Sequence, residues 1–310
     1  MRPCLRSSRP NFYEGIELIW LVGNKGMLGT ELALLLAERG AEFFGTDRER
    51  DITDPEALGE GLEGLGIDWI VNCSAYTAVD RAEDEEEAAR AINARGAANL
   101  AAFASRLGAR FVHLSTDYVF SGEGDRPYLE DDPAAPAGAY GRTKAEGESL
   151  VRSACERHFI VRTAWLYGRH GKNFVYTMLK AMRDREEVGI VTDQRGNPTW
   201  ARDLAESILR IALSGTEAYG TYHFTNRGET TWYEFAAEIQ RLGLAAGLLQ
   251  REARLKPLTS DQYPAKVKRP RYSVLGKEKI SRVFGIEPPE WRESLRTFIE
   301  GIAKDGCPLL

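Results

Sequence analysis

The chain has little cysteine and little histidine. Its four cysteines (Cys4, Cys73, Cys155 and Cys307) lie too far apart for a zinc site or a disulfide framework, which favours a reduced, cytoplasmic protein. Its four histidines (His113, His158, His170 and His223) show no ligand spacing, so we expect no catalytic metal.

The chain also lacks long apolar runs and a strong charge of one sign. Its longest apolar stretches have the length of a strand, far short of the roughly 20 residues that span a bilayer. Residues 1–15 are basic without the apolar core of a secretory signal, and we expect them to form a flexible extension. The net charge of -5 gives no general attraction to nucleic acid or to anionic membranes.

What the chain does have is an alternation of strand-like and helix-like segments. Its 310 residues, 43% of them apolar, suffice for a substantial core. Apolar runs predict strands at 16–23, 41–47, 67–75, 109–120 and 158–168. Helical spacing predicts helices at 30–40, 83–108 and 140–158. This order is typical of an α/β fold with a doubly wound parallel sheet.

After about residue 170 this regularity weakens and prolines become frequent. We therefore expect a Rossmann domain that binds NAD(P) over residues 16–170. Residues 171–310 would form mainly a second, smaller substrate-binding domain, with some segments returning to the Rossmann sheet. No Ser/Gly-rich linker separates the two parts, so they should share an interface.

Three glycines follow the first predicted strand, in the stretch LVGNKGMLGTEL. Gly23, Gly26 and Gly29 form a weak pattern alone, but here they stand between a strand and a helix, where backbone N–H groups would face a pyrophosphate. Asp47 closes the second predicted strand, where an acid can accept hydrogen bonds from an adenosine ribose. The stretch therefore predicts a dinucleotide loop.

A second motif is YGRTK, in which Tyr140 and Lys144 share a helix face. A neighbouring ammonium group should lower the pKa of the phenol toward a value useful for proton transfer. Upstream, a predicted strand ends in Ser115 and Thr116, and ligands bind beyond the carboxyl ends of such strands. A hydroxyl group, a tyrosine and a lysine beside a nicotinamide pocket indicate a carbonyl reductase.

Together these motifs resemble those of the dTDP-4-dehydrorhamnose reductases, a branch of the extended short-chain dehydrogenases/reductases. The resemblance runs from Ile16 to the C-terminus and includes GNKGMLG, VNCSAYTAVDRAED, STDYVFSG, YGRTKAEGE, TDQRGNPT and RPRYSVL. It implies reduction of the C4 ketone of dTDP-4-dehydro-L-rhamnose to dTDP-L-rhamnose with NADH or NADPH. The partner would be a dTDP-sugar, with no nucleic acid and no membrane.

Carried over residue by residue, the resemblance implies three groups of site residues. The catalytic residues would be Thr116, Tyr140 and Lys144. The cofactor would contact Gly23, Gly26, Met27, Leu28, Gly29, Asp47, Asp51, Ile52, Ala75, Tyr76, Thr77, Tyr140 and Lys144. The substrate would contact Thr116, Asp117, Trp165 and Asn173. The chain departs from the family pattern at Met27, usually a glutamine, in a loop that acts mainly through its backbone.

Some family members carry a magnesium ion between subunits, and Glu31 matches one of its ligands. The resemblance thus raises a structural Mg²⁺ and a homodimer as further expectations. A sugar-nucleotide dehydratase would need an Asp–Glu pair after the active-site threonine, whereas here Asp117 and Tyr118 follow it. The catalytic residues alone do not exclude an epimerase, and a regulatory subunit that only binds dinucleotide is the alternative from another class.

Three other features have more ordinary interpretations. The acidic run from Glu83 to Arg90 is typical of a solvated helix start. Trp232, which follows two threonines, is expected to be a packing residue. The basic stretch from Lys266 to Arg271 is either a solvated loop or a clamp for a substrate diphosphate.

Overall fold

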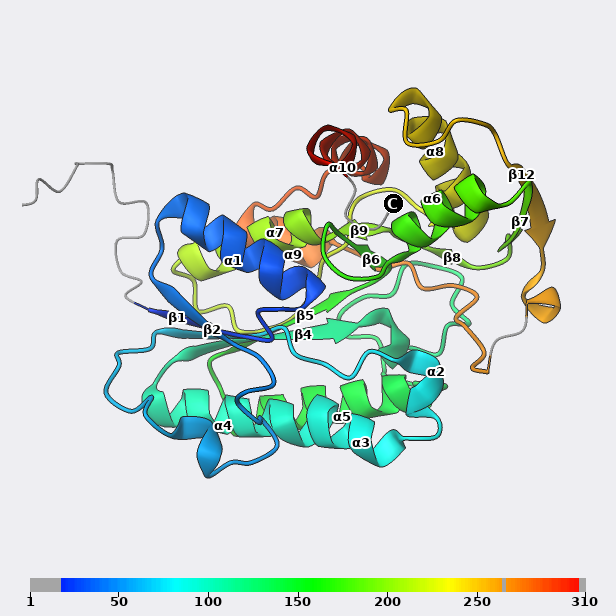
Figure 1. The fold of residues 1–310 in the computed structure, drawn as a ribbon. Coiled ribbons are helices and arrows are strands. Elements are labelled where there is room, and N and C mark those ends of the chain that lie inside the picture. Colours follow the sequence, from blue (N-terminus) through cyan, green and yellow to red (C-terminus); the bar gives the residue numbers. More distant parts are fainter. Residues whose placement is uncertain (1–17, 264–265, 307–310) are drawn as a thin grey trace, which may run out of the picture.

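A six-stranded parallel sheet forms the centre of the computed structural model, which describes residues 18–263 and 266–306 (Figure 1). The extension predicted for residues 1–15 lies outside the described residues. The strand order is β2-β1-β3-β4-β5-β10, so the order reverses between β1 and β3. The doubly wound α/β fold is confirmed. The strands are β1 (Ile19–Val22), β2 (Phe43–Thr46), β3 (Trp69–Asn72), β4 (Arg110–Thr116), β5 (His158–Thr163) and β10 (Gly220–His223).

Helices cover both faces of the sheet because alternate residues of each strand point to opposite sides. In β1, Ile19 and Leu21 join the core beneath α1 (Met27–Arg39), α7 (Ala201–Leu213) and α9 (Glu278–Phe284). Trp20 and Val22 join the opposite core, against α4 (Ala97–Leu107) and α5 (Ala139–Ala154). Figure 1 shows these two helix layers above and below the sheet.

The helix predicted over 83–108 is interrupted. After the short α2 (Val79–Ala82), α3 (Glu86–Arg90) leads through a π-helical turn at Ala91–Gly96 into α4. The strand predicted over 109–120 ends at Thr116 and passes into the 3₁₀ turn η3 (Asp117–Val119). A second 3₁₀ turn, η1 (Ala57–Gly59), follows β2.

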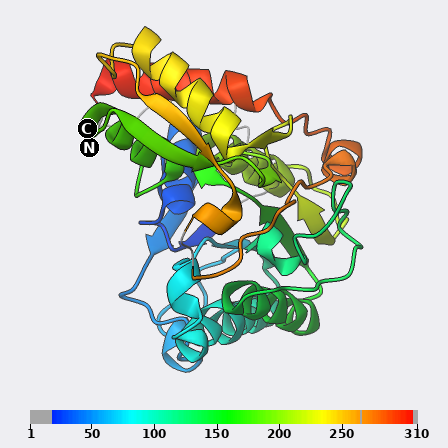
Figure 2. The ribbon, with the colours of Figure 1, turned by 90° about the vertical axis from the view of Figure 1, so that its right-hand side faces the viewer.

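A separate apolar core lies beyond the carboxyl ends of the strands. It joins α6 (Phe174–Asp184), α8 (Trp232–Ala245) and α10 (Trp291–Asp305) through side chains such as Leu179, Phe235 and Phe298. The parallel pair β7 (Glu187–Val191) and β12 (Arg254–Leu258) packs beside it and leads to η4 (Ser260–Gln262) (Figure 2). Short pairs are β6 (Leu166–Tyr167) with β9 (Thr199–Trp200) and β8 (Arg195–Gly196) with β11 (Thr230–Thr231). Among the described residues, no helix is long and apolar enough to cross a membrane.

Candidate active site

The loop after β1 depends on two glycines whose side-chain positions are filled by backbone. Gly23 has a φ of 77°, and a Cβ there would lie 2.7 Å from the nitrogen of Ser74, in the loop after β3. A Cβ on Gly29 would lie 2.1 Å from the carbonyl oxygen of Gly23. The N–H of Gly23 donates to the carbonyl oxygen of Thr46 at 2.7 Å, which ties the loop to β2. The loop thus sits where the strand order reverses, the usual binding crevice of such sheets.

The N-terminus of α1 is suited to a pyrophosphate. Gly26 occupies the N-cap, and no side chain caps the helix. The first turn contains no acidic residue, so the positive end of the helix dipole is not countered there. Backbone N–H groups at a helix start of this kind bind phosphate oxygens. The loop therefore fits the pyrophosphate of a nicotinamide dinucleotide.

The predicted adenosine-side residues lie in and after the loop that follows β2. Asp47 comes directly after the strand, is half-buried, and donates its N–H to Oε1 of Glu49 at 2.8 Å. Asp51 is exposed, and its carboxylate accepts hydrogen bonds from the N–H and hydroxyl of Thr53, which hold its pKa below the usual range. Ile52 is buried in the core beside α4. Of the three predicted residues, Asp47 is the one at the carboxyl end of β2.

The loop after β3 is fastened to α5 by Asn93, a residue that the sequence reasoning missed. Its Oδ1 accepts from the N–H of Tyr76 at 2.8 Å, and its Nδ2 donates to the carbonyl oxygen of Tyr76 at 3.2 Å and to Oγ1 of Thr143 at 3.1 Å. Ala75 and Thr77 flank Tyr76 in this loop. Asn93 lies in the π-helical turn, a feature frequent at functional sites. A π-helical turn would have pointed to Asn93, but the sequence pattern predicts one continuous helix over this stretch and does not reveal the turn.

Thr116 and Tyr140 meet at the carboxyl end of β4. Thr116 is the last residue of the strand, and its hydroxyl donates to Oδ1 of Asp117 at 2.9 Å. Tyr140 lies in the first turn of α5, with its ring edge-on to Tyr118 at 5.5 Å between centroids. Burial raises the pKa of the Tyr140 phenol, and a hydrogen bond with the Thr116 side chain offsets part of that rise. The phenol is therefore protonated at neutral pH.

The predicted lowering of the Tyr140 pKa by Lys144 is wrong for this structure. Nζ of Lys144 donates to the carbonyl oxygen of Leu114 at 2.6 Å and lies 3.3 Å from Nε2 of His113. Its side chain is fully buried, and burial lowers the pKa of Lys144 to about 8. Although Tyr140 and Lys144 share a helix, the amine contacts β4, and Lys144 is not among the groups that shift the pKa of Tyr140.

A cavity of about 660 Å³ is within the usual range for a small-molecule site, and neither Thr116 nor Tyr140 is among its lining residues. Asp117, which follows Thr116, lines it and is itself buried. Burial raises the pKa of the Asp117 carboxyl to about 6, although hydrogen bonds from Thr116 and Ser273 oppose the rise. The lining also includes Trp165, Trp232, two residues of α6 and segments around residues 120, 190, 260 and 270.

Trp165 has a strained backbone in this wall. Its φ of 46° is the one positive φ among the described non-glycine residues, and such strain clusters at functional sites. It explains why the strand predicted over 158–168 breaks after Thr163. The indole stacks on Trp232 with 3.5 Å between centroids and 8° between planes. Trp232 stands at the start of α8, directly after the capping Thr231, and thus lines the cavity as well as packing.

The basic stretch pairs across to the other half of the chain. Its ion pairs are Arg269 with Asp80 at 2.6 Å, Lys268 with Glu123 at 2.8 Å, and Lys266 with Asp84. Figure 2 shows this segment descending from η4 toward α2. Lys268, Arg269 and Arg271 line the cavity, so the segment is more than a solvated loop. No single stretch of sequence reveals these pairings.

Two of the residues predicted from the sequence, Asn173 and Glu31, do not line the cavity. Asn173 caps α6 by accepting from the N–H of Tyr176, and its Nδ2 donates to the carbonyl oxygen of Gly168 at 2.8 Å. It does not line the cavity, and its substrate role stays a prediction. Glu31 is buried on α1. No group of three His, Cys, Asp or Glu side chains that could hold a metal occurs in the part of the chain described, so the magnesium expectation is not supported.

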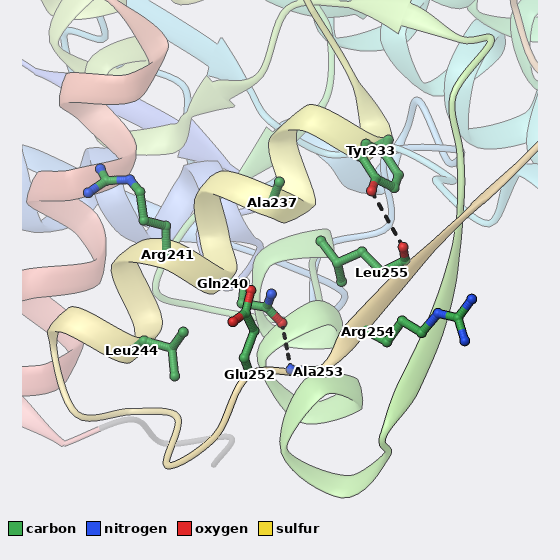
Figure 3. Close-up of a pocket in the computed structure, with 9 residues that line it drawn as sticks. All are labelled: Tyr233, Ala237, Gln240, Arg241, Leu244, Glu252, Ala253, Arg254 and Leu255. Carbon is green, nitrogen blue, oxygen red and sulfur yellow. Dashed lines mark hydrogen bonds between the residues drawn. The ribbon is translucent and has the colours of Figure 1, made fainter.

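A second hollow, of about 590 Å³, lies between α8 and β12 (Figure 3). Its walls are fixed by Gln240, which accepts from the N–H of Ala253 at 3.0 Å, and by the Tyr233 hydroxyl, which donates to the carbonyl oxygen of Leu255 at 3.4 Å. Its lining contains none of the predicted site residues. The first cavity, whose lining includes the predicted site residues Asp117 and Trp165, is therefore the candidate substrate site.

The parallel sheet, the glycine loop and the Thr–Tyr–Lys set are the marks of a short-chain dehydrogenase/reductase. A family model described as the RmlD substrate binding domain matches residues 17–303. The chain is 38% identical over 288 residues to the dTDP-4-dehydrorhamnose reductase of Escherichia coli (strain K12), covering 91% of this chain and 96% of that protein. The chain thus belongs to the dTDP-4-dehydrorhamnose reductase family.

Two solved structures agree with this assignment. A dTDP-4-dehydrorhamnose reductase from Clostridium acetobutylicum is 40% identical with a TM-score of 0.86, and covers 92% of this chain and 99% of its own. A dTDP-4-dehydrorhamnose reductase from Bacillus anthracis, solved in complex with NADP, is 36% identical with a TM-score of 0.84, and covers 91% and 98%. The fold, the enzyme class and the family predicted from the sequence are therefore confirmed.

Proposed function

We propose that the protein uses NADH or NADPH to reduce the C4 ketone of dTDP-4-dehydro-L-rhamnose, giving dTDP-L-rhamnose. The observation that carries the proposal is that Thr116, which contacts Tyr140, directly precedes Asp117 in the wall of a cavity of about 660 Å³. The family membership of the chain supports the choice of substrate. The bound cofactor supplies the hydride to the ketone carbon.

The residues of the chain would share the remaining work. The Tyr140 phenol, kept protonated by burial, would give its proton to the ketone oxygen, and Thr116 would donate a hydrogen bond to the same oxygen. General acid help of this kind contributes roughly 10²- to 10⁴-fold. Lys144 would stabilise the phenolate and hold the nicotinamide ribose. For that role its amine must leave the carbonyl oxygen of Leu114.

The substrate would lie in the cavity with its diphosphate toward the basic stretch. Arg269 presents a guanidinium group, which pairs well with phosphate oxygens. It now pairs with Asp80, so a diphosphate would have to exchange with that carboxylate. Trp165 would stack on the sugar or the base and donate one hydrogen bond through its indole N–H. Asp117, in the same wall, would bind a sugar hydroxyl.

An NAD(P)H oxidation assay tests the proposal. The substrate dTDP-4-dehydrorhamnose would be made in situ from dTDP-glucose by the two preceding enzymes, and dTDP-glucose alone would serve as the control. We expect consumption of NAD(P)H equal to the dTDP-L-rhamnose formed. An epimerase would change the sugar without net consumption, and a regulatory subunit would bind the dinucleotide without turnover. Either result would refute the proposal.

We extend the proposal to the organisation of the chain. Residues 16–170 would act mainly on the cofactor and residues 171–310 mainly on the substrate, with β10, α7 and α9 returning to the sheet. The resemblance to the reductases further favours a homodimer in the cytoplasm. Light scattering of the purified protein measures the oligomeric state, and cell fractionation measures the cellular location.

A further inference from the structure

We infer that His113 is a positioning residue for Lys144, and that Asn72 fixes the tautomer with which it acts. His113 lies on β4, fully buried. Its Nδ1 is 3.1 Å from Nδ2 of Asn72 on β3, and its Nε2 is 3.3 Å from Nζ of Lys144 on α5. The three buried side chains are therefore linked in series, from Asn72 through His113 to Lys144. The inference rests on the proposed function only for the importance of Lys144.

Asn72 determines which imidazole nitrogen carries the proton. Its Oδ1 accepts from the N–H and the hydroxyl of Ser74, at 3.0 and 2.5 Å. The atom that faces His113 is therefore the amide nitrogen, which can only donate. Nδ1 of His113 must then be the acceptor, and the single N–H of the neutral ring lies on Nε2.

This tautomer discriminates between the two charge states of Lys144. The Nε2–H group of His113 can donate a hydrogen bond to the lone pair of a neutral Lys144 amine. A Lys144 ammonium group has no lone pair, so two N–H donors would then face each other. Burial, together with the charge of Lys144, holds the pKa of His113 well below its usual range, so the ring stays neutral. His113 thus favours the neutral amine in the position beside Leu114, and favours departure of the ammonium from it.

The other charged groups around these three side chains do not cancel the effect. Glu148, one turn beyond Lys144 on α5, favours the ammonium, but its carboxylate is held by Arg162 of β5 at 2.7 and 2.8 Å. His158 of β5 also lowers the pKa of His113. Asp117 lines the cavity, and its charge acts on Tyr140 rather than on His113 or Lys144.

Nitrogen NMR of the labelled full chain reads the tautomer without any turnover. In the wild type we expect a protonated Nε2 and a bare Nδ1 that persist as the pH is lowered through the usual titration range of histidine, with signals assigned by their loss in H113Q. In N72D the new carboxylate accepts from Nδ1–H, so the tautomer should reverse. K144M should shift the Nε2 signal. A wild-type Nδ1–H tautomer, or a K144M spectrum identical to the wild type, would overturn the inference.

The pH profile of kcat/KM provides the second measurement. With Nε2 bare in N72D, His113 can accept from the ammonium, so the ionisation assigned to Lys144 should rise by about one pH unit or more, tenfold in its equilibrium constant. H113F should lower kcat about tenfold, while H113Q, whose amide can still donate to Lys144, should recover most of it.

H158Q is the control for the contact with Lys144, because His158 is a buried histidine on the neighbouring strand that hydrogen-bonds the carbonyl oxygen of Cys155 and acts on His113 only through its charge. Equal effects in H158Q and H113F, or an unshifted N72D profile, would contradict the inference. If H113F does not fold, the tautomer in N72D decides. If the enzyme fails to reduce dTDP-4-dehydrorhamnose while the NMR results hold, the proposed function fails and the inference about Lys144 stands.

Discussion

The glycine loop and the cavity lined by Asp117 are built in opposite ways. The loop is a continuous stretch after β1 that works through its backbone, and Gly23 and Gly29 leave no room for a side chain. The cavity is lined by side chains from distant segments, including Trp165, Trp232 and Arg269. A site made of backbone can be recognised from local spacing, whereas a site made of distant side chains needs the folded chain.

Tyr140 contacts Thr116, the residue before Asp117 of the cavity wall, and as the proposed proton donor its replacement should have the largest effect. Tyr140→Phe removes the proton donor and keeps the ring. We expect kcat to fall by at least ~10²-fold, the low end of general acid catalysis, with little change in NADH affinity. Steady-state kinetics and a cofactor titration measure the two quantities. Turnover near that of the wild type would remove Tyr140 from the catalytic role.

Gly29→Ala tests the backbone side of the comparison. The added Cβ would lie 2.1 Å from the carbonyl oxygen of Gly23, so the loop must move away from its place over α1. We expect the Kd for NADPH to rise about tenfold or more, about 1.4 kcal/mol, while substrate binding stays unchanged.

Gly26→Ala is a graded comparison in the same loop, since its Cβ would lie 3.3 Å from the same oxygen, a tight contact that a small shift can relieve, so its effect should be smaller than that of Gly29→Ala. Calorimetric titration of the three proteins with NADPH measures the difference. Equal affinities in all three would show that the loop does not hold the cofactor.

The same contrast explains what the sequence could predict. The β/α alternation, the glycine loop and the Tyr140–Lys144 spacing are local patterns, and the structure places each on the expected kind of element. The orientation of Lys144 was not predictable, because it depends on His113, 31 positions away, and His113 in turn contacts Asn72 across 41 positions. Scattered histidines give no such signal.

Irregular backbone escaped prediction for a related reason. The π-helical turn that presents Asn93 lies within a pattern that reads as one helix. The indole of Trp165, whose φ is positive, stacks on Trp232 and packs close to Gly196, and both come from other parts of the chain. In both places tertiary contacts override the local preference of the sequence.

Trp165→Ala tests the side-chain half of the comparison. If the indole stacks on the substrate, its loss should raise KM for the sugar nucleotide roughly 3- to 10-fold, the equivalent of 0.5–1.5 kcal/mol for an aromatic contact. NADH binding and Tm should stay near wild type. If the indole mainly closes the wall against Trp232, the change should instead lower stability by about 3–5 kcal/mol.

Trp69→Ala gives the reference for a pure packing loss, because Trp69 is buried in the sheet core. Kinetics and thermal melts of both variants separate the two roles. A large fall in Tm for Trp165→Ala with unchanged KM would move Trp165 from the substrate site to the packing of the wall.

The smallest expected effect is the choice between NADH and NADPH. It sharpens the comparison because a side chain, Asp47, would here act beside the glycine loop, which otherwise works through its backbone. Asp47 would accept from the ribose 2′-hydroxyl of NADH and repel the 2′-phosphate of NADPH. Arg48, exposed beside it, can pair with that phosphate. We therefore expect both cofactors to work, with at most a mild preference for NADH. Arg48→Ala should strengthen that preference and Asp47→Ala should reverse it, as measured by kcat/KM for each cofactor. A wild-type preference beyond ~100-fold in either direction, about 2.7 kcal/mol, would mean that one of the two residues dominates and that the balance between them does not exist.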